Sequence, residues 1–194
     1  MELQGERLIP ASVDATWAAL NDPDVLKACI AGCESVERTG DDAFSAVVAL
    51  KVGPVSARFK GSLKLTNVNP PTSYTINFDG QGGVAGFGRG SADVALSAID
   101  ATTTRLAYHA RATVGGKMAQ IGSRLIDATA AKITEDFFKA FEAHLQAGAA
   151  PVEGADGAAV VAAPVPIASD PGIAKLWWLI GAVVVLAVVY FMIR

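Results

Sequence analysis

Apolar and polar residues alternate along much of the chain before residue 115. In the clearest run, residues 55–68, Phe59 and Leu63 alternate with Arg58 and Lys60. A period of two is typical of strands with one buried and one solvated face, so it indicates an antiparallel sheet covered on one side. Interrupted by turn sequences, the same pattern predicts strands at residues 2–9, 34–39, 43–52, 55–68, 73–80, 88–98 and 104–114.

Two short helices are predicted between the first two strands. Residues 10–22 form the first, with Ser12 in the N-cap position, where its hydroxyl can accept a hydrogen bond from the first turn. Residues 22–30 form the second, with Asp22 as the cap and Pro23 at the first helical position.

A single long helix is predicted over residues 115–145, because its apolar residues recur at helical spacing. That stripe would cover one side of the sheet, and it consists of Met118, Ile121, Leu125, Ile133, Phe137, Phe141 and Leu145. An antiparallel sheet curved around one long C-terminal helix is the helix-grip architecture of the α+β class. We expect residues 1–147 to form this domain.

The remaining residues predict a linker and a membrane anchor. Residues 148–174 are rich in Ala, Pro and Gly without periodicity, as is typical of linkers. Within the predicted anchor, residues 175–194, an uncharged run of about 18 residues would span roughly 27 Å as a helix, close to the hydrocarbon thickness of a bilayer. Trp177, Trp178 and Tyr190 stand near its ends, as aromatic residues do at membrane interfaces.

The location of the domain follows from the start of the sequence. No basic region leading into an apolar run is present at the N-terminus, so the sequence shows no signal peptide. We therefore expect a C-terminal tail anchor in the inner (cytoplasmic) membrane, with the domain facing the cytoplasm.

The net charge and the cysteines argue against two classes of function, nucleic-acid binding and zinc binding. The net charge of −3 gives no electrostatic reason to expect binding to nucleic acid. Cys29 and Cys33 would need further ligands to hold zinc, and the histidines, His109 and His144, are not at ligand spacing from them. We expect reduced structural thiols and no metal site.

The stretch GQGGVA, residues 80–85, has the spacing of a dinucleotide-binding loop. Such a loop must open a helix, whose N-terminus binds the pyrophosphate. Residues 88–98 alternate as a strand instead, which argues against nucleotide binding.

Small residues at inward positions suggest an internal cavity. On the sheet they are Gly61, Gly80, Ala92, Ala110 and Ala112, and on the helix Gly122, Ala128 and Thr129. Protein interiors do not leave voids without cost, so an apolar ligand would fill the space. The alternative is a sheet that flattens to close it, with small residues reflecting only an alanine-rich composition.

Four sequence blocks carry a family resemblance: NDPDVLKACIAGCESVE, VALKVGPVSARFKGSLKLTNVNPP, GGVAGFGRGSADVAL and VGGKMAQIGSRLID. In this order they resemble the CoxG subunit of carbon monoxide dehydrogenase over nearly all of residues 1–145. The resemblance implies a START-like (SRPBCC, Bet v 1-like) fold and a non-catalytic accessory role in carbon monoxide oxidation. It further implies a partner, a molybdenum-containing carbon monoxide dehydrogenase or a related molybdenum hydroxylase, recruited to the membrane. It also implies handling of the respiratory quinone that accepts the electrons, of menaquinone or ubiquinone type.

Three hypotheses stay open at this point. The chain is a quinone-carrying membrane-anchored accessory protein, a pure anchor for the dehydrogenase without a ligand, or an enzyme of the aromatase/cyclase or hydrolase kind. The sequence disfavours the last, because neither histidine lies near a candidate nucleophile and no pair of carboxylates is marked out. Glu135 and Asp136 are adjacent on the long helix and are expected to form a solvated face.

Candidate site residues follow from the favoured hypothesis. We expect the cavity to be lined by Phe59, Phe78, Phe87, Tyr108, Met118, Ile121, Gly122 and Leu125, with Phe87 as a flap and the Tyr108 hydroxyl as a partner for a quinone carbonyl. Gly82, Gly83, Gly86, Gly88 and Gly90 would make a pliable rim, and Gly115 and Gly116 a hinge. Arg58, Lys60 and Lys64, with Lys51 on the neighbouring strand, are candidates for docking the dehydrogenase or anionic head groups.

Overall fold

The structure is a computed structural model that describes residues 1–148. The predicted anchor, with Trp177, Trp178 and Tyr190, lies outside the described residues, and so does the predicted linker apart from Gly148. None of the helices within residues 1–148 has the length and apolar character needed to span a bilayer.

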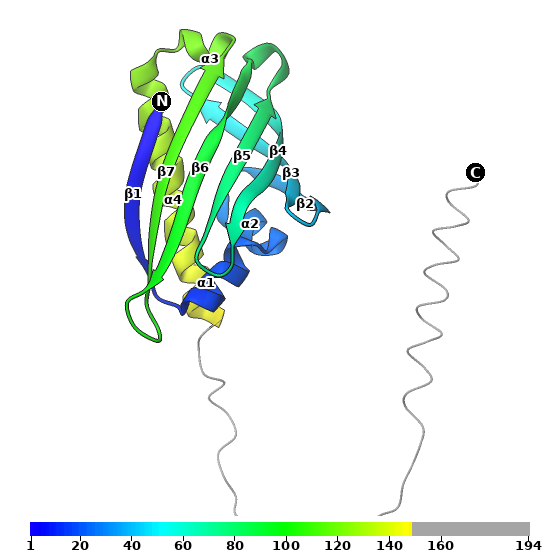
Figure 1. The fold of residues 1–194 in the computed structure, drawn as a ribbon. Helices are drawn as coiled ribbons and strands as arrows, with labels where there is room; N and C mark the ends of the chain where they lie inside the picture. The colour runs from blue at the N-terminus through cyan, green and yellow to red at the C-terminus, as the bar shows by residue number, and fades with distance from the viewer. Residues whose placement is uncertain (149–194) are drawn as a thin grey trace, which may run out of the picture. The chain divides into compact units, whose positions relative to one another are not determined.

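One seven-stranded antiparallel sheet forms most of the domain, in the order β1-β7-β6-β5-β4-β3-β2 (Figure 1). Strands β2 to β7 form a meander, and the last strand, β7, also pairs with the first, β1. The bounds are β1 Glu2–Ile9, β2 Cys33–Gly40, β3 Ala43–Val52, β4 Val55–Asn69, β5 Ser73–Gln81, β6 Phe87–Ala98 and β7 Thr104–Gly115. The predicted strands are confirmed to within about one residue at each end, because alternation sets both type and extent.

Helices α1, Val13–Leu20, and α2, Pro23–Cys29, follow β1 as predicted. The Ser12 hydroxyl accepts a hydrogen bond from the Ala15 amide at 3.3 Å. The Asp22 carboxylate accepts one from the Asp24 amide at 2.8 Å, with Pro23 in the first turn. Both predicted caps are confirmed, and each pairs an amide that the helix itself leaves without a partner.

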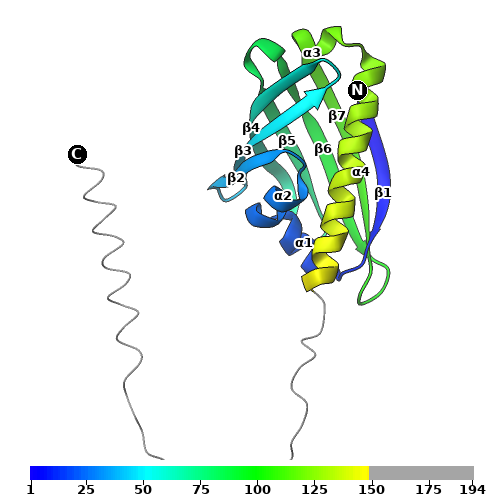
Figure 2. The same ribbon diagram turned by 180° about the vertical axis from the view of Figure 1, so that it is seen from behind.

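The prediction of one continuous C-terminal helix is wrong. The segment forms a short helix α3, Lys117–Gln120, and a long helix α4, Ser123–Gly148. Gly122 lies between them with a φ of +97°, a left-handed conformation that glycine adopts readily and that ends a right-handed helix. Figure 2 shows α4 running along the inner face of the sheet, so the helix-grip arrangement itself is confirmed.

The buried residues form three separate clusters. The largest joins Ile9 and Leu106 of the sheet to Phe138 and Phe141 of α4, and a second surrounds Tyr74. A third, the loop-end cluster, consists of Val52, Ala85 and Met118. It lies where three connections meet, and we call these the loop end: the β3–β4 turn, residues 82–86 with the 3-10 helix η1 (Gly83–Ala85), and residues 115–122 with α3. The opposite, far end holds α1, the start of α2 and the β6–β7 turn (Figure 1).

Candidate functional site

The middle of the inner sheet face carries mostly small side chains, with Phe78 beside them, between the loop-end cluster and the two other clusters. Strand register places them on that face: Gly61 pairs with Gly80, Gly80 with Gly88, Gly90 with Ala112, and Ala92 with Ala110. The inward placement predicted for Gly61, Gly80, Ala92, Ala110 and Ala112 is therefore confirmed.

Gly88 is the most informative of these positions. A Cβ atom built there would meet no heavy atom within 4 Å, its chain neighbours aside. Its strand partner Val114 packs against the loop-end cluster, so Gly88 shares the inner face with that cluster. Open space in front of an inward-facing strand residue means that side chains do not fill the interior there.

Helix α4 packs tightly only in its second half. Phe138 and Phe141 are its buried residues, and both lie in the largest cluster. In the first half, Ile126, Thr129 and Ile133 are half-buried, while Ala128 is exposed and does not face the sheet as predicted. The loosely covered half of the helix therefore lies at the level of the small residues.

Three of the predicted lining residues come together at the loop end. Met118 is buried in the loop-end cluster, and Phe59 and Ile121 pack against it. Leu125 is 41% exposed, and its methyl group lies beside Gly53 in the β3–β4 turn. Leu125 is thus at the rim, because the break at Gly122 turns the start of α4 away from the stripe that a continuous helix would present.

Phe78 and Tyr108 lie further along the inner face. Phe78 is half-buried and pairs with Leu63 on β4 and Gly90 on β6. Tyr108 packs against the largest cluster, with its ring centroid 5.4 Å from that of Phe138. Both are inward-facing as predicted, with Phe78 directly beside Gly90 and Tyr108 nearer the largest cluster.

Phe87 does not line the interior. It pairs with Gly115, so it points away from the face that Gly88 and Val114 share. Its ring lies against Gly115 and 5.6 Å from the Arg89 guanidinium carbon on the outer face. The prediction of an inner flap is wrong, because strand β6 starts at Phe87, one residue earlier than expected, and this fixes its parity.

The glycine-rich loop has a structural explanation. Gly86 has a φ of +115°, and a Cβ atom there would collide with the carbonyl oxygen of Gly115. Gly82 leaves room for the Phe59 ring. The loop therefore packs closely against β4 and the β7–α3 connection, and the segment after it is strand β6, as predicted.

An ion pair closes the seam between β1 and α4. Arg7 donates to the Glu135 carboxylate, and its guanidinium carbon lies 5.6 Å from the centre of the Phe138 ring. The Glu135 side chain is still 60% exposed, so the predicted solvated face is confirmed, with this added contact to β1. Asp136 pairs with Lys132 one turn away at 2.9 Å, as solvated helix residues often do.

The predicted docking residues Arg58, Lys60 and Lys64 are exposed along the outer face of β4. The Arg58 Nε donates to a Glu34 carboxylate oxygen at 2.7 Å, which neutralises part of the patch. Within residues 1–148, Lys60 and Lys64 form no ion pair. These two lysines are the stronger candidates for an acidic partner.

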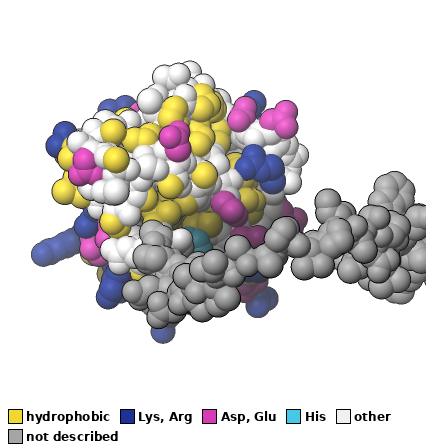
Figure 3. Space-filling model, turned by 90° about the horizontal axis from the view of Figure 1, so that it is seen from below, with side chains coloured by type: hydrophobic (Ala, Val, Ile, Leu, Met, Phe, Trp, Pro, Cys, Tyr) yellow, Lys and Arg dark blue, Asp and Glu magenta, His cyan; other side chains and the backbone are white. Residues whose placement is uncertain are grey.

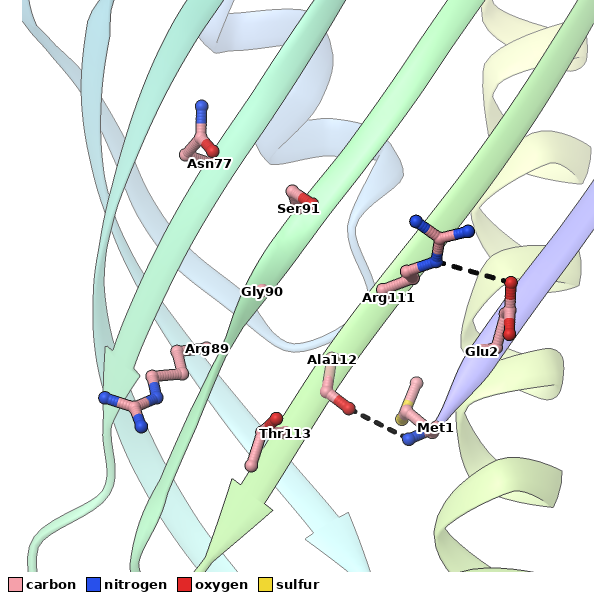
Figure 4. Close-up of a pocket in the computed structure, with 9 residues that line it drawn as sticks. All are labelled: Met1, Glu2, Asn77, Arg89, Gly90, Ser91, Arg111, Ala112 and Thr113. Carbon is pink, nitrogen blue, oxygen red and sulfur yellow. Dashed lines mark hydrogen bonds and ion pairs between the residues drawn. The ribbon is translucent and has the colours of Figure 1, made fainter.

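A polar hollow that the sequence did not indicate lies on the same outer face (Figure 4). Its volume is about 620 Å³, and its charged lining side chains are Arg89, Arg111 and Glu2. Hydrogen bonds from His109 and Arg111 lower the pKa of Glu2. Finding the hollow needed the β1–β7 register, which joins residues more than a hundred positions apart.

The two cysteines are free thiols in the described fold. Cys29 is buried and Cys33 half-buried, and burial raises the pKa of both thiols. Within the described part of the chain, no group of three His, Cys, Asp or Glu residues is placed to hold a metal ion.

Solved structures share this fold. A conserved protein from Geobacillus kaustophilus is 30% identical, with a TM-score of 0.72 over 76% of this chain and 97% of that chain. The Zhui aromatase/cyclase from Streptomyces sp. R1128 is 14% identical, with a TM-score of 0.60 over 80% of this chain and 99% of that one. A START superfamily protein from Mycobacterium smegmatis is 12% identical, with a TM-score of 0.58 over 75% and 97% of the two chains.

These likenesses support the START-like fold, and the last two show the fold alone. No curated protein sequence matches this chain significantly. The family model of CoxG, a carbon monoxide dehydrogenase subunit, matches residues 5–146, nearly the whole described domain. The chain therefore belongs to the CoxG family of carbon monoxide dehydrogenase subunits.

Proposed function

We propose that this protein carries a respiratory quinone in the interior of its domain and recruits a molybdenum-containing carbon monoxide dehydrogenase to the cytoplasmic membrane. Membership of the CoxG family supports an accessory role for carbon monoxide dehydrogenase. The observation that carries the proposal of a ligand is the unfilled inner position at Gly88.

The physical need for a carrier comes from the isoprenoid tail of the quinone. Withdrawing that tail from a bilayer into water exposes apolar surface at about 25 cal/mol per Å². A patch of glycine and alanine on the inner face, beside Phe78 and between apolar clusters at both ends, offers apolar surroundings and room. The phenol of Tyr108, on the inner face, is our candidate hydrogen-bond donor to a quinone carbonyl.

Recruitment is assigned to two other parts of the chain. The sequence of residues 175–194 supplies the anchor, with Trp177, Trp178 and Tyr190 at the interfaces. Lys60 and Lys64 on the outer face of β4 supply the docking contact with an acidic surface of the enzyme. We assign no reaction to the domain itself, since the aromatase/cyclase shares only its fold.

The test compares quinone content in two matched variants of the full chain. Gly88→Leu places a side chain in the open inner space. Ser97→Leu adds a comparable leucine to the same strand at an exposed position. Both proteins and the wild type are purified from the same quinone-producing membranes, and solvent extracts are quantified by mass spectrometry per mole of protein.

We expect quinone with the wild type and Ser97→Leu, and a loss of at least fivefold with Gly88→Leu. Equal quinone in all three would mean that it is carried over from the membrane and not bound inside. Absence of quinone with the dehydrogenase still co-purifying would replace the carrier with a pure anchor. Turnover of a substrate without any partner would replace both with an enzyme.

A further inference from the structure

The loop end of the domain exposes to solvent large apolar side chains of a kind that proteins usually bury. Val84, in the 3-10 helix η1, is 86% exposed, and Leu125 at the start of α4 is 41% exposed. Val84 belongs to a three-residue turn whose backbone is fixed by close contact between Gly86 and Gly116. Because the backbone of this turn is already fixed, inserting the Val84 side chain into another apolar phase would cost little conformational entropy.

The charged residues around these side chains are mostly basic. The three segments that form the loop end, residues 51–57, 80–88 and 115–126, contain no aspartate or glutamate, although the exposed Asp79 and Asp127 directly adjoin two of them. They contain three basic residues, Lys51, Lys117 and Arg124, and all three are exposed. Basic side chains therefore outnumber acidic ones at the loop end, beside exposed apolar side chains, in a chain whose net charge is −3.

The far end carries acidic side chains together with basic ones. Asp14, Asp22, Asp24 and Asp100 are exposed there, in α1, before and within α2, and in the β6–β7 turn. Figure 3, which views this end, shows acidic and basic side chains around an apolar area. The loop end, where basic side chains outnumber acidic ones, is therefore the end that an anionic surface would attract more strongly.

We infer that the loop end docks on the surface of an anionic lipid bilayer, with Val84 and Leu125 entering the interfacial region and Lys51, Lys117 and Arg124 contacting the head groups. Interfacial membrane binding combines burial of apolar side chains with attraction of basic side chains to anionic lipids, and the loop end offers both. This contact goes beyond the proposed function, since it is made by the domain and needs neither a quinone nor the anchor.

The length of the chain allows this contact together with a tail anchor. Helix α4 has 26 residues, or about 39 Å, and carries the chain toward the far end. Residues 149–175 number 27 and reach at most about 90 Å when fully extended. The chain is therefore long enough for residues 176–193 to enter the same bilayer that the loop end touches.

The experiment uses residues 1–148, so that the predicted anchor cannot contribute. This part contains every strand and all three clusters, and the Geobacillus protein, 97% of whose length is matched by 76% of this chain, shows that a domain of this extent forms alone. Quinone-free vesicles of phosphatidylcholine alone, or with one third phosphatidylglycerol, are sedimented with the protein at low and high salt.

We expect binding to the anionic vesicles only, and a decrease of at least tenfold in 0.5 M salt, as follows from screening of head-group contacts. The double variant Lys117→Glu/Arg124→Glu should partition onto the anionic vesicles at least tenfold less than the wild type. Each basic residue near an anionic surface contributes about fivefold to partitioning, and this variant removes two. Its matched control is Lys27→Glu/Lys139→Glu, the same charge change at exposed positions outside the loop end.

Val84→Asp should lose binding, while Leu8→Asp should retain it, because Leu8 is 61% exposed on the outer face of β1. Equal losses in the controls would show that another face, or net charge alone, makes the contact. Failure of the wild-type domain to sediment with anionic vesicles would overturn the inference. Binding of the domain to the dehydrogenase that Val84→Asp abolishes, without vesicle binding, would assign the loop end to the protein partner.

Discussion

Two glycines on one strand make a direct test of whether the interior is open. Gly88 and Gly90 lie two residues apart on β6 and face the same side of the sheet. A Cβ atom at Gly88 meets nothing within 4 Å, whereas one at Gly90 would collide with the carbonyl oxygen of Arg111. Alanine at each position therefore samples open space in one case and neighbouring backbone in the other.

The expected magnitudes follow from general values for such changes. Gly88→Ala should stabilise the domain by about 0.4–1 kcal/mol, because alanine has less conformational freedom to lose and needs no room that is occupied. Gly90→Ala must shift strand β7 and should cost about 1–3 kcal/mol. For a domain of this size, 1 kcal/mol changes Tm by roughly 2–4 °C, so the two Tm values should separate by at least about 3 °C.

Urea unfolding of residues 1–148, followed by circular dichroism, measures both differences at a common m-value. The wild-type protein must be ligand-free in this assay, because a bound quinone would stabilise the native state by mass action. If Gly88→Ala destabilises the domain as much as Gly90→Ala, the inner face is filled and the reasoning about a ligand fails.

Three further predictions concern other parts of the fold. Thr16 is fully buried, and its hydroxyl has no hydrogen-bond partner among the described residues, so Thr16→Val should raise the free energy of unfolding by up to about 1 kcal/mol, measured in urea. A thiol reagent should modify Cys33 before Cys29, since Cys29 is only 4% exposed, and mass spectrometry of the early product checks the order. Lys60→Glu/Lys64→Glu should abolish co-purification of the dehydrogenase with the full chain while Arg58→Glu has a smaller effect, because Glu34 already pairs with Arg58; equal effects would contradict this ranking.

Much of the sheet could be predicted because the signal for each strand lies in its own sequence. Along β4, the polar residues Arg58, Lys60 and Lys64 fall on one face and Phe59 and Leu63 on the other. This pattern depends only on residues two positions apart, so no knowledge of the rest of the chain is needed. The capping residues Ser12 and Asp22 were predictable for the same reason.

Features that depend on one residue's conformation, or on pairing between distant segments, were missed. Gly122 is compatible with a helix in sequence, and only its φ of +97° shows the break between α3 and α4. Phe87 was expected in the loop before β6, and only the start of the strand at Phe87 shows that its side chain follows the alternation of β6 and points to the outer face. Arg7 and Glu135 are 128 positions apart, so their pairing follows from the packing of α4 on β1 and not from either local sequence.

The glycines of the sheet separate into those that the fold requires and those that it does not. Gly5 makes room for the Tyr108 phenol and Gly82 for the Phe59 ring, and a side chain at Gly90 would strike the neighbouring strand. Gly80 and Gly88 pair directly, yet a Cβ atom at Gly80 would make only an ordinary contact and one at Gly88 none. Nothing within the described domain needs these two positions to be small, although an empty apolar space beside them has a cost. A ligand from outside the chain, lying against this glycine pair, would account for both facts at once.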